Sequence, residues 1–156
     1  MKVLEEYLNY IEKNKKLSKN TVASYNRDLK KYVEYLNERN INLSDVVEND
    51  IISYLIELEK EDISVASISR MISSIKSYHD YLFFNKILDT DPSKNIKKPK
   101  VKRVDVEILT EDEVDKLLKF EDLSTPKRIR DKAIFEILYG TGIKVTELID
   151  MNLEDV

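Results

Sequence analysis

The sequence predicts an all-α protein, and three observations support this class. Only two of the 156 residues are glycine and only three are proline, so few positions interrupt a helix. Apolar residues recur at helical spacing in four successive stretches before residue 90. Residue types that begin or end helices, among them Ser18, the Thr110–Glu113 capping box and Gly140, stand where such stretches start or stop.

Four helices are expected in the first part of the chain. The fourth has the clearest pattern and should run from Ser64 to about Asn85, with its apolar residues on one stripe. We interpret His79 and most tyrosines as core residues because they fall on these stripes. The apolar positions that mark the four helices are, in chain order, Leu4, Tyr7, Leu8 and Ile11; Val22, Tyr25, Leu29, Val33 and Leu36; Ile51, Ile52, Leu55 and Leu58; and Ile68, Met71, Ile72, Ile75, Tyr78, His79 and Leu82.

A break in the pattern then divides the chain. Residues 89–105 contain two prolines, have no helical period and include six basic residues, which is typical of an interdomain linker. The domains are therefore predicted at 1–98 and 109–156, with a basic linker at 99–108.

Three shorter helices are expected after the linker. The Thr110–Glu113 capping box opens the first, and Thr125 with Pro126 opens the second, which should stop at Gly140. The last should start near Lys144.

Composition excludes several classes of function. The chain has no cysteine and one histidine, which removes thiol catalysis and Cys-based zinc sites, so we expect no metal and no cofactor. No apolar run exceeds four residues, so no membrane span or signal peptide is expected, and we predict a cytoplasmic protein without a membrane partner.

The net charge of −4 argues at first against a nucleic-acid partner, but it hides a division. Through Arg103 there are 19 basic and 16 acidic residues, a net charge of +3, whereas from Val104 onward 7 basic residues stand against 14 acidic ones. The two parts therefore need separate interpretations.

Basic and hydroxyl side chains gather opposite the apolar stripes of the second and fourth expected helices. Short polar side chains let a helix approach a phosphate backbone closely, and Arg and Lys can then contact phosphates or base edges. Close helix packing or plain solvation is the alternative for the face of the fourth helix, and an ordinary solvated face is the alternative for the second. The outward face of the fourth helix is expected to consist of Ser69, Arg70, Ser73, Ser74, Lys76 and Ser77. From the two faces we select as candidate DNA-binding residues Lys19, Asn20, Ser24, Arg27 and Lys31 on the second helix, and Arg70, Ser73, Lys76 and Ser77 on the fourth.

The linker adds a third basic feature. Six cations lie within ten residues, from Lys94 to Arg103, and such a run repels itself unless a polyanion neutralises it. Exposed basic linkers are also common, which is the alternative. Of this run we select Lys98, Lys100, Lys102 and Arg103 as candidate DNA-binding residues.

Two stretches carry a family resemblance that spans nearly the whole chain. Residues 17–29, LSKNTVASYNRDL, resemble the start of the core-binding domain of tyrosine recombinases of the phage-integrase and Xer type. Residues 130–148, RDKAIFEILYGTGIKVTEL, look like the opening of their catalytic domain. The resemblance implies a four-helix SAM-like domain, a linker and the first helices of a truncated catalytic domain. It also implies double-stranded DNA as partner, further copies or another recombinase subunit beside it, and no metal.

The resemblance also implies a catalytic tyrosine near the C-terminus, helped by two arginines, a histidine or tryptophan, and a lysine. The sequence stops at Val156, and none of its tyrosines matches the nucleophile position. Lys144 stands at the position of the family's first catalytic arginine. Lysine keeps the positive charge there but lacks the planar guanidinium that can bind two phosphate oxygens at once. The alternative role of Lys144 is to cap the preceding turn.

We therefore expect this chain to bind DNA, as part of a site-specific recombinase that acts in DNA integration and recombination, and to be inactive in cleavage by itself. The alternative is a helical protein-interaction or regulatory module that acts on a recombinase.

Overall fold

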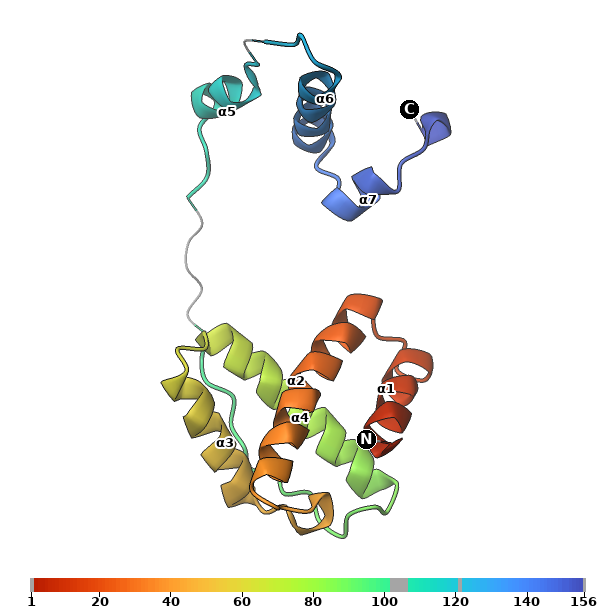
Figure 1. Ribbon diagram of the computed structural model, residues 1–156, viewed down its shortest axis with the longest axis vertical. Coiled ribbons are helices and arrows are strands. Elements are labelled where there is room, and N and C mark those ends of the chain that lie inside the picture. The colour runs from red at the N-terminus through yellow and green to blue at the C-terminus, as the bar shows by residue number, and fades with distance from the viewer. Residues whose placement is uncertain (1, 102–106, 121, 156) are drawn as a thin grey trace. The chain divides into compact units, whose positions relative to one another are not determined.

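The computed structural model describes residues 2–101, 107–120 and 122–155, and every regular element within these ranges is a helix (Figure 1). The predicted all-α class is confirmed for these residues. The chain divides into two compact units, Met1–Arg103 and Val104–Val156, which are described separately below.

Four helices and one 3-10 turn build the first unit, as the apolar spacing predicts. Ser18 and Ser64 begin the two long helices, because each hydroxyl accepts a hydrogen bond from a backbone N–H three residues later, at 3.2 and 3.3 Å. In Figure 1, α4 crosses α2 in the middle of the unit; it packs on α2 and also on α3. The elements are α1 (Lys2–Lys13), α2 (Lys19–Glu38), the 3-10 turn Leu43–Asp45, α3 (Glu48–Lys60) and α4 (Val65–Phe84).

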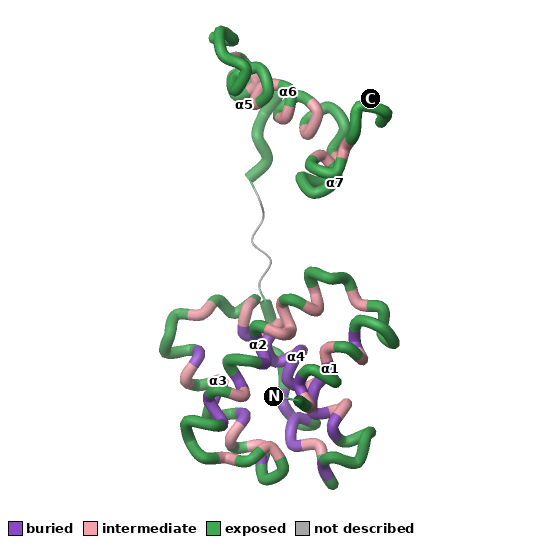
Figure 2. Tube along the Cα trace, turned by 45° about the vertical axis from the view of Figure 1, so that its right-hand side comes forward, coloured by how far each residue is buried: buried purple, intermediate pink, exposed green. Residues whose placement is uncertain are grey.

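The core of this unit is rich in tyrosine and contains most of the residues expected there. Ile52 is an exception, since it is exposed, 100° around α3 from the buried Ile51. Figure 2 marks the buried residues in purple. Every residue predicted for the apolar stripe of α4 is buried, His79 included. Tyr7, Tyr32 and Tyr78 are fully enclosed, while Tyr25 is half-buried. The rings of Tyr7 and Tyr78 meet edge to face with centroids 5.1 Å apart, a favourable aromatic geometry.

The stretch after α4 belongs to the first unit for longer than its irregular sequence indicates. Leu88, Pro92, Ser93 and Ile96 are buried, and the carboxylate of Asp91 accepts hydrogen bonds from the backbone N–H and the hydroxyl of Ser93. The stretch therefore packs on the core as far as Ile96, which lies within the predicted domain 1–98, although residues 89–105 lack a helical period. Proline ends a helix, but it does not stop neighbouring apolar side chains from being buried.

The second unit contains α5 (Glu111–Leu118), α6 (Pro126–Thr141), α7 (Val145–Ile149) and the 3-10 turn Leu153–Asp155. The capping box forms as predicted, since the Thr110 hydroxyl accepts from the Glu113 N–H and the Glu113 carboxylate accepts from the Thr110 N–H. However, α6 continues through Gly140 and ends at Gly142, which adopts the left-handed region with φ of +66°.

Apolar side chains of the second unit are mostly exposed or half-exposed (Figure 2). Val114 is the one buried hydrophobic residue among those described here, and Ile108, Ile149 and Leu153 are 90%, 74% and 97% exposed. None of the helices in the described part of the chain is long and apolar enough to cross a membrane.

Candidate nucleic-acid interface

One stripe of α2 carries most of its candidate residues. Asn20, Ser24, Arg27 and Lys31 follow one another at spacings of four, three and four residues, which places them on one side of a helix. Asn20, Arg27 and Lys31 are exposed, Ser24 is half-buried, and Lys19 is exposed in the first turn. This stripe is thus available to a ligand in the way the sequence predicts.

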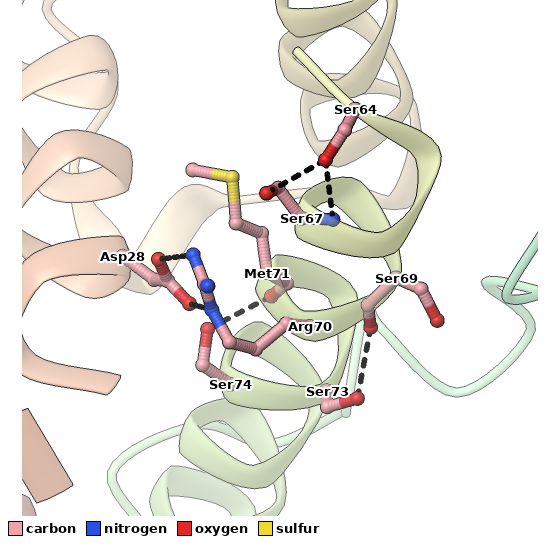
Figure 3. Close-up of polar contacts among 8 residues, drawn as sticks. All are labelled: Asp28, Ser64, Ser67, Ser69, Arg70, Met71, Ser73 and Ser74. Atoms are coloured by element: carbon pink, nitrogen blue, oxygen red, sulfur yellow. Dashed lines mark hydrogen bonds and ion pairs between the residues drawn. The ribbon is translucent and has the colours of Figure 1, made fainter. Parts of the chain in front are cut away.

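An ion pair joins α2 to α4 beside this stripe. The Arg70 guanidinium donates two hydrogen bonds to the Asp28 carboxylate, Nε to Oδ2 at 3.0 Å and Nη2 to Oδ1 at 2.9 Å (Figure 3). The Asp28 side chain is only 3% exposed and that of Arg70 is 41% exposed. The hydrogen bond to Asp28 raises the pKa of Arg70, so the guanidinium stays charged. The sequence predicts Arg70 as a DNA contact, but its guanidinium already binds a buried carboxylate.

Two serines of α4 have backbone partners, as Figure 3 shows. The Ser73 hydroxyl donates to the carbonyl oxygen of Ser69, and the Ser74 hydroxyl donates to that of Met71, both at 2.9 Å. Ser74 is fully buried, so its placement on the outward face is wrong. The reason is that α4 is covered over a wider arc than its apolar stripe, with α2 and α3 both packed on it. Ser69, Ser73 and Ser77 are half-buried.

Lys76 also has partners within the first unit. Its Nζ donates to the carbonyl oxygens of Lys94 and Ile96, each at 3.0 Å. The polar side-chain atoms of Arg70, Ser74 and Lys76 thus all have partners within the first unit, which is the arrangement that the packing alternative predicts.

The two candidate faces flank the Asp28–Arg70 pair. At 100° per residue, the α2 stripe lies on one side of Asp28, and Ser73 and Ser77 lie next to Arg70 around α4. The pair joins the two helices at a partly exposed edge, here called the seam, with the α2 stripe on the Asp28 side and Ser73 and Ser77 on the Arg70 side. The candidate interface is this seam, a row of hydroxyl, amide and basic groups on α2 and α4.

The basic segment after Ile96 is exposed where the structure describes it. Lys97, Lys98 and Lys100 are exposed, while the candidates Lys102 and Arg103 lie outside the described residues. The positions of Lys98 and Lys100 are thus compatible with the predicted role.

His79 has a structural partner. Its Nε2 lies 3.0 Å from the Tyr32 hydroxyl, and the two rings meet edge to face. Burial lowers the pKa of His79 to about 4, against a smaller opposite effect of Asp91, so the imidazole is neutral at pH 7. Within the described residues no three side chains of the metal-binding types gather to hold an ion.

Lys144 precedes α7 and its side chain is 81% exposed. Its backbone N–H donates to the Glu147 carboxylate at 2.8 Å, and its Nζ lies 3.7 Å from the same group. Lys144 therefore caps the start of the following helix α7, whereas the alternative role was capping of the preceding turn; its exposure agrees with that alternative.

Sequence reasoning missed the two long-range polar pairs, Asp28–Arg70 and Tyr32–His79. One signal for the first was available, since Asp28 directly precedes Leu29 at the edge of the apolar stripe of α2. A carboxylate so close to a core face needs a cation, but the period of a helix does not say which one.

The first unit is thus a helical domain with basic and hydroxyl side chains along one seam, an arrangement that suits a polyanionic ligand. Residues 4–86 match the N-terminal SAM-like domain of phage integrases, and residues 107–156 match the phage integrase family. The chain belongs to the phage integrase family.

Known relatives agree with this membership. The chain is 43% identical over 154 residues to a protein of Caldanaerobacter subterraneus subsp. tengcongensis, covering 99% of this chain and 53% of that protein. It is 38% identical to tyrosine recombinase XerD of Oceanobacillus iheyensis, with 98% of this chain and 52% of the relative covered. It is 37% identical to tyrosine recombinase XerC of Roseiflexus castenholzii, with coverages of 98% and 49%. The chain thus spans about half the length of the curated relatives it matches.

Proposed function

We propose that this chain binds double-stranded DNA as the helical clamp portion of a site-specific tyrosine recombinase. The observation that carries the proposal is the α2 stripe, where Arg27 and Lys31 are exposed beside Asn20 and Ser24. Residues of these types can donate to phosphate oxygens while a helix lies close to the duplex. The family membership supports the same ligand.

The proposed contacts are not uniform in kind. Lys19, Arg27, Lys31, Lys98 and Lys100 would neutralise phosphates, and the shorter Asn20, Ser24, Ser73 and Ser77 would approach them along the seam. Most of the affinity would then be electrostatic and would fall steeply as salt is added. Arg70 would border the DNA while it keeps its bond to Asp28.

The test is fluorescence anisotropy of a labelled duplex of about 30 base pairs, titrated with the full chain at several salt concentrations. The variant Arg27→Gln/Lys31→Gln removes two exposed charges, and we expect it to reduce the slope of log affinity against log salt by roughly 2. Lys60→Gln is the matched control, because Lys60 is an exposed cation at the far end of α3.

Two results would refute the proposal: binding that does not respond to salt, or a double variant that binds like the control. Charge reversal at Arg70 is a poor substitute for this test. It would place a carboxylate against the buried Asp28, so a loss of binding would follow from damage to the fold.

We propose further that the chain binds DNA without cleaving it. The exposed position of Lys144 beside Glu147 supports this, since no bidentate phosphate grip is available there. Incubation with nicked duplex should give no covalent protein–DNA adduct, and an adduct would overturn this part.

A protein-binding role is the second candidate, and the second unit favours it. Ile108, Ile149 and Leu153 are largely exposed in a part of the chain that carries an acidic excess. Apolar side chains exposed in this way are typical of a surface to which another protein binds. Under this candidate alone, the anisotropy experiment gives no binding to DNA at low salt.

A further inference from the structure

Lys76 lies within α4 and contacts a stretch of chain eighteen to twenty residues further on. Its Nζ donates hydrogen bonds of 3.0 Å to the carbonyl oxygens of Lys94 and Ile96. Both carbonyls belong to irregular backbone that no helix satisfies. A charged donor shared by two carbonyls holds such backbone more firmly than a neutral donor would.

The same stretch is anchored to the rest of the first unit as well. Ser93 and Ile96 are buried in the unit, and the side-chain amide of Asn95 donates to the Glu48 carboxylate of α3 at 3.0 Å. The backbone of 93–96 is therefore attached to the interior, to α3 and, through Lys76, to α4.

The exposed basic segment begins at the next residue. Lys97, Lys98 and Lys100 follow Ile96 directly, so the place where Ile96 is held determines where these cations start. Cations that are held in position before binding lose less conformational freedom when they meet phosphates.

We propose that Lys76 is a positioning residue, which holds the backbone of 94–96 so that Lys97, Lys98 and Lys100 approach DNA from a fixed point. It does not itself contact DNA. This inference rests on the proposed function, because it assigns Lys76 a role in presenting part of that interface. The competing role is direct contact, in which the ammonium leaves both carbonyls to meet a phosphate.

The first test uses the full chain without DNA. Trypsin should cleave Lys76→Met about three to ten times faster than the parent chain after Lys94 and Lys97, because the stretch opens more often. Lys76→Arg should restore slow cleavage, since a guanidinium can donate to both carbonyls. Cleavage after Lys60 reports general unfolding and should not change. Equal cleavage of the parent chain and Lys76→Met after Lys94 would overturn the proposal.

The second test compares DNA affinities in a double-mutant cycle. Lys76→Met should weaken binding several-fold in the parent chain and have no effect when Lys97, Lys98 and Lys100 are all replaced by glutamine. Losses that multiply would show that Lys76 contacts a phosphate itself, against the proposal.

The two tests can fail independently of each other. If the parent chain binds no duplex at all, the proposed function and the role of Lys76 in presenting cations to DNA are both refuted. Cleavage after Lys94 then still decides whether Lys76 holds the backbone.

Discussion

Replacing Arg70 by methionine should destabilise the first unit, although Arg70 lies on a face that resembles a DNA-binding surface. The change removes two charged hydrogen bonds, of 3.0 and 2.9 Å, and leaves a carboxylate whose side chain is 3% exposed without its cation. Breaking a buried ion pair from one side costs about 3–5 kcal/mol. The Arg70 side chain is 41% exposed, so water can reach the vacated position, and we expect a loss of about 2 kcal/mol.

The assay is urea and thermal unfolding of the full chain, followed by far-ultraviolet circular dichroism in buffer without DNA. A loss of this size corresponds to a fall in Tm of about 8–16 °C for a unit of this length. Asp28→Leu/Arg70→Met removes both charges and should regain most of the stability, because no unpaired carboxylate is left.

Arg27→Met is the control, since Arg27 is exposed one position before Asp28, and its unfolding free energy should change by less than about 0.5 kcal/mol. The reasoning fails if Arg70→Met unfolds together with the parent chain, or if the double variant is as unstable as the single one.

Three further changes should be measurable. Because the pKa of His79 is about 4 in the folded chain and 6.5 in its ordinary state, the unfolded chain binds more protons between these values. Stability should fall by about 3 kcal/mol as pH drops from 6.5 to 4, and His79→Leu should lack this contribution in urea titrations at each pH. Gly142→Ala should destabilise the end of α6 by about 1 kcal/mol, because Gly142 has a left-handed φ of +66°. Gly140→Ala should be neutral or stabilising. Amide hydrogen exchange at the end of α6 distinguishes the two variants, and equal effects would contradict the assignment of Gly142 as the cap. Ser64→Ala should lower the free energy of unfolding in urea by about 1 kcal/mol, because it removes the cap of α4. Ser67→Ala should lower it less. An unchanged free energy of unfolding for Ser64→Ala would argue against the cap.

The helices could be predicted from the sequence because their signals are local. The period of apolar residues located α4 and its start near Ser64, and the hydroxyl cap Ser18 marked where α2 begins. The end of α6 was misplaced by two residues, because Gly140 and Gly142 are both able to end a helix and only the backbone conformation distinguishes them.

The candidate site was predicted less completely, because its side chains depend on contacts between distant residues. Arg70 and Lys76 have the charge and spacing of a DNA-binding face, and nothing local indicates that Asp28 and the carbonyl of Ile96 would be their partners. The α2 stripe was easier to predict, since its exposure needs no distant partner.

The buried stretch after α4 determines where the first unit could be joined to another protein. The match to the SAM-like domain ends at residue 86, but the side chains that complete the core continue to Ile96. A fusion made at residue 86 would omit Leu88, Pro92, Ser93 and Ile96 and would leave the hydrophobic surface beneath them open to solvent. A junction beyond Lys100 would retain both the complete interior and the described part of the cationic segment. For this fold, the sequence boundary of the domain and the physical boundary of its core are at least ten residues apart.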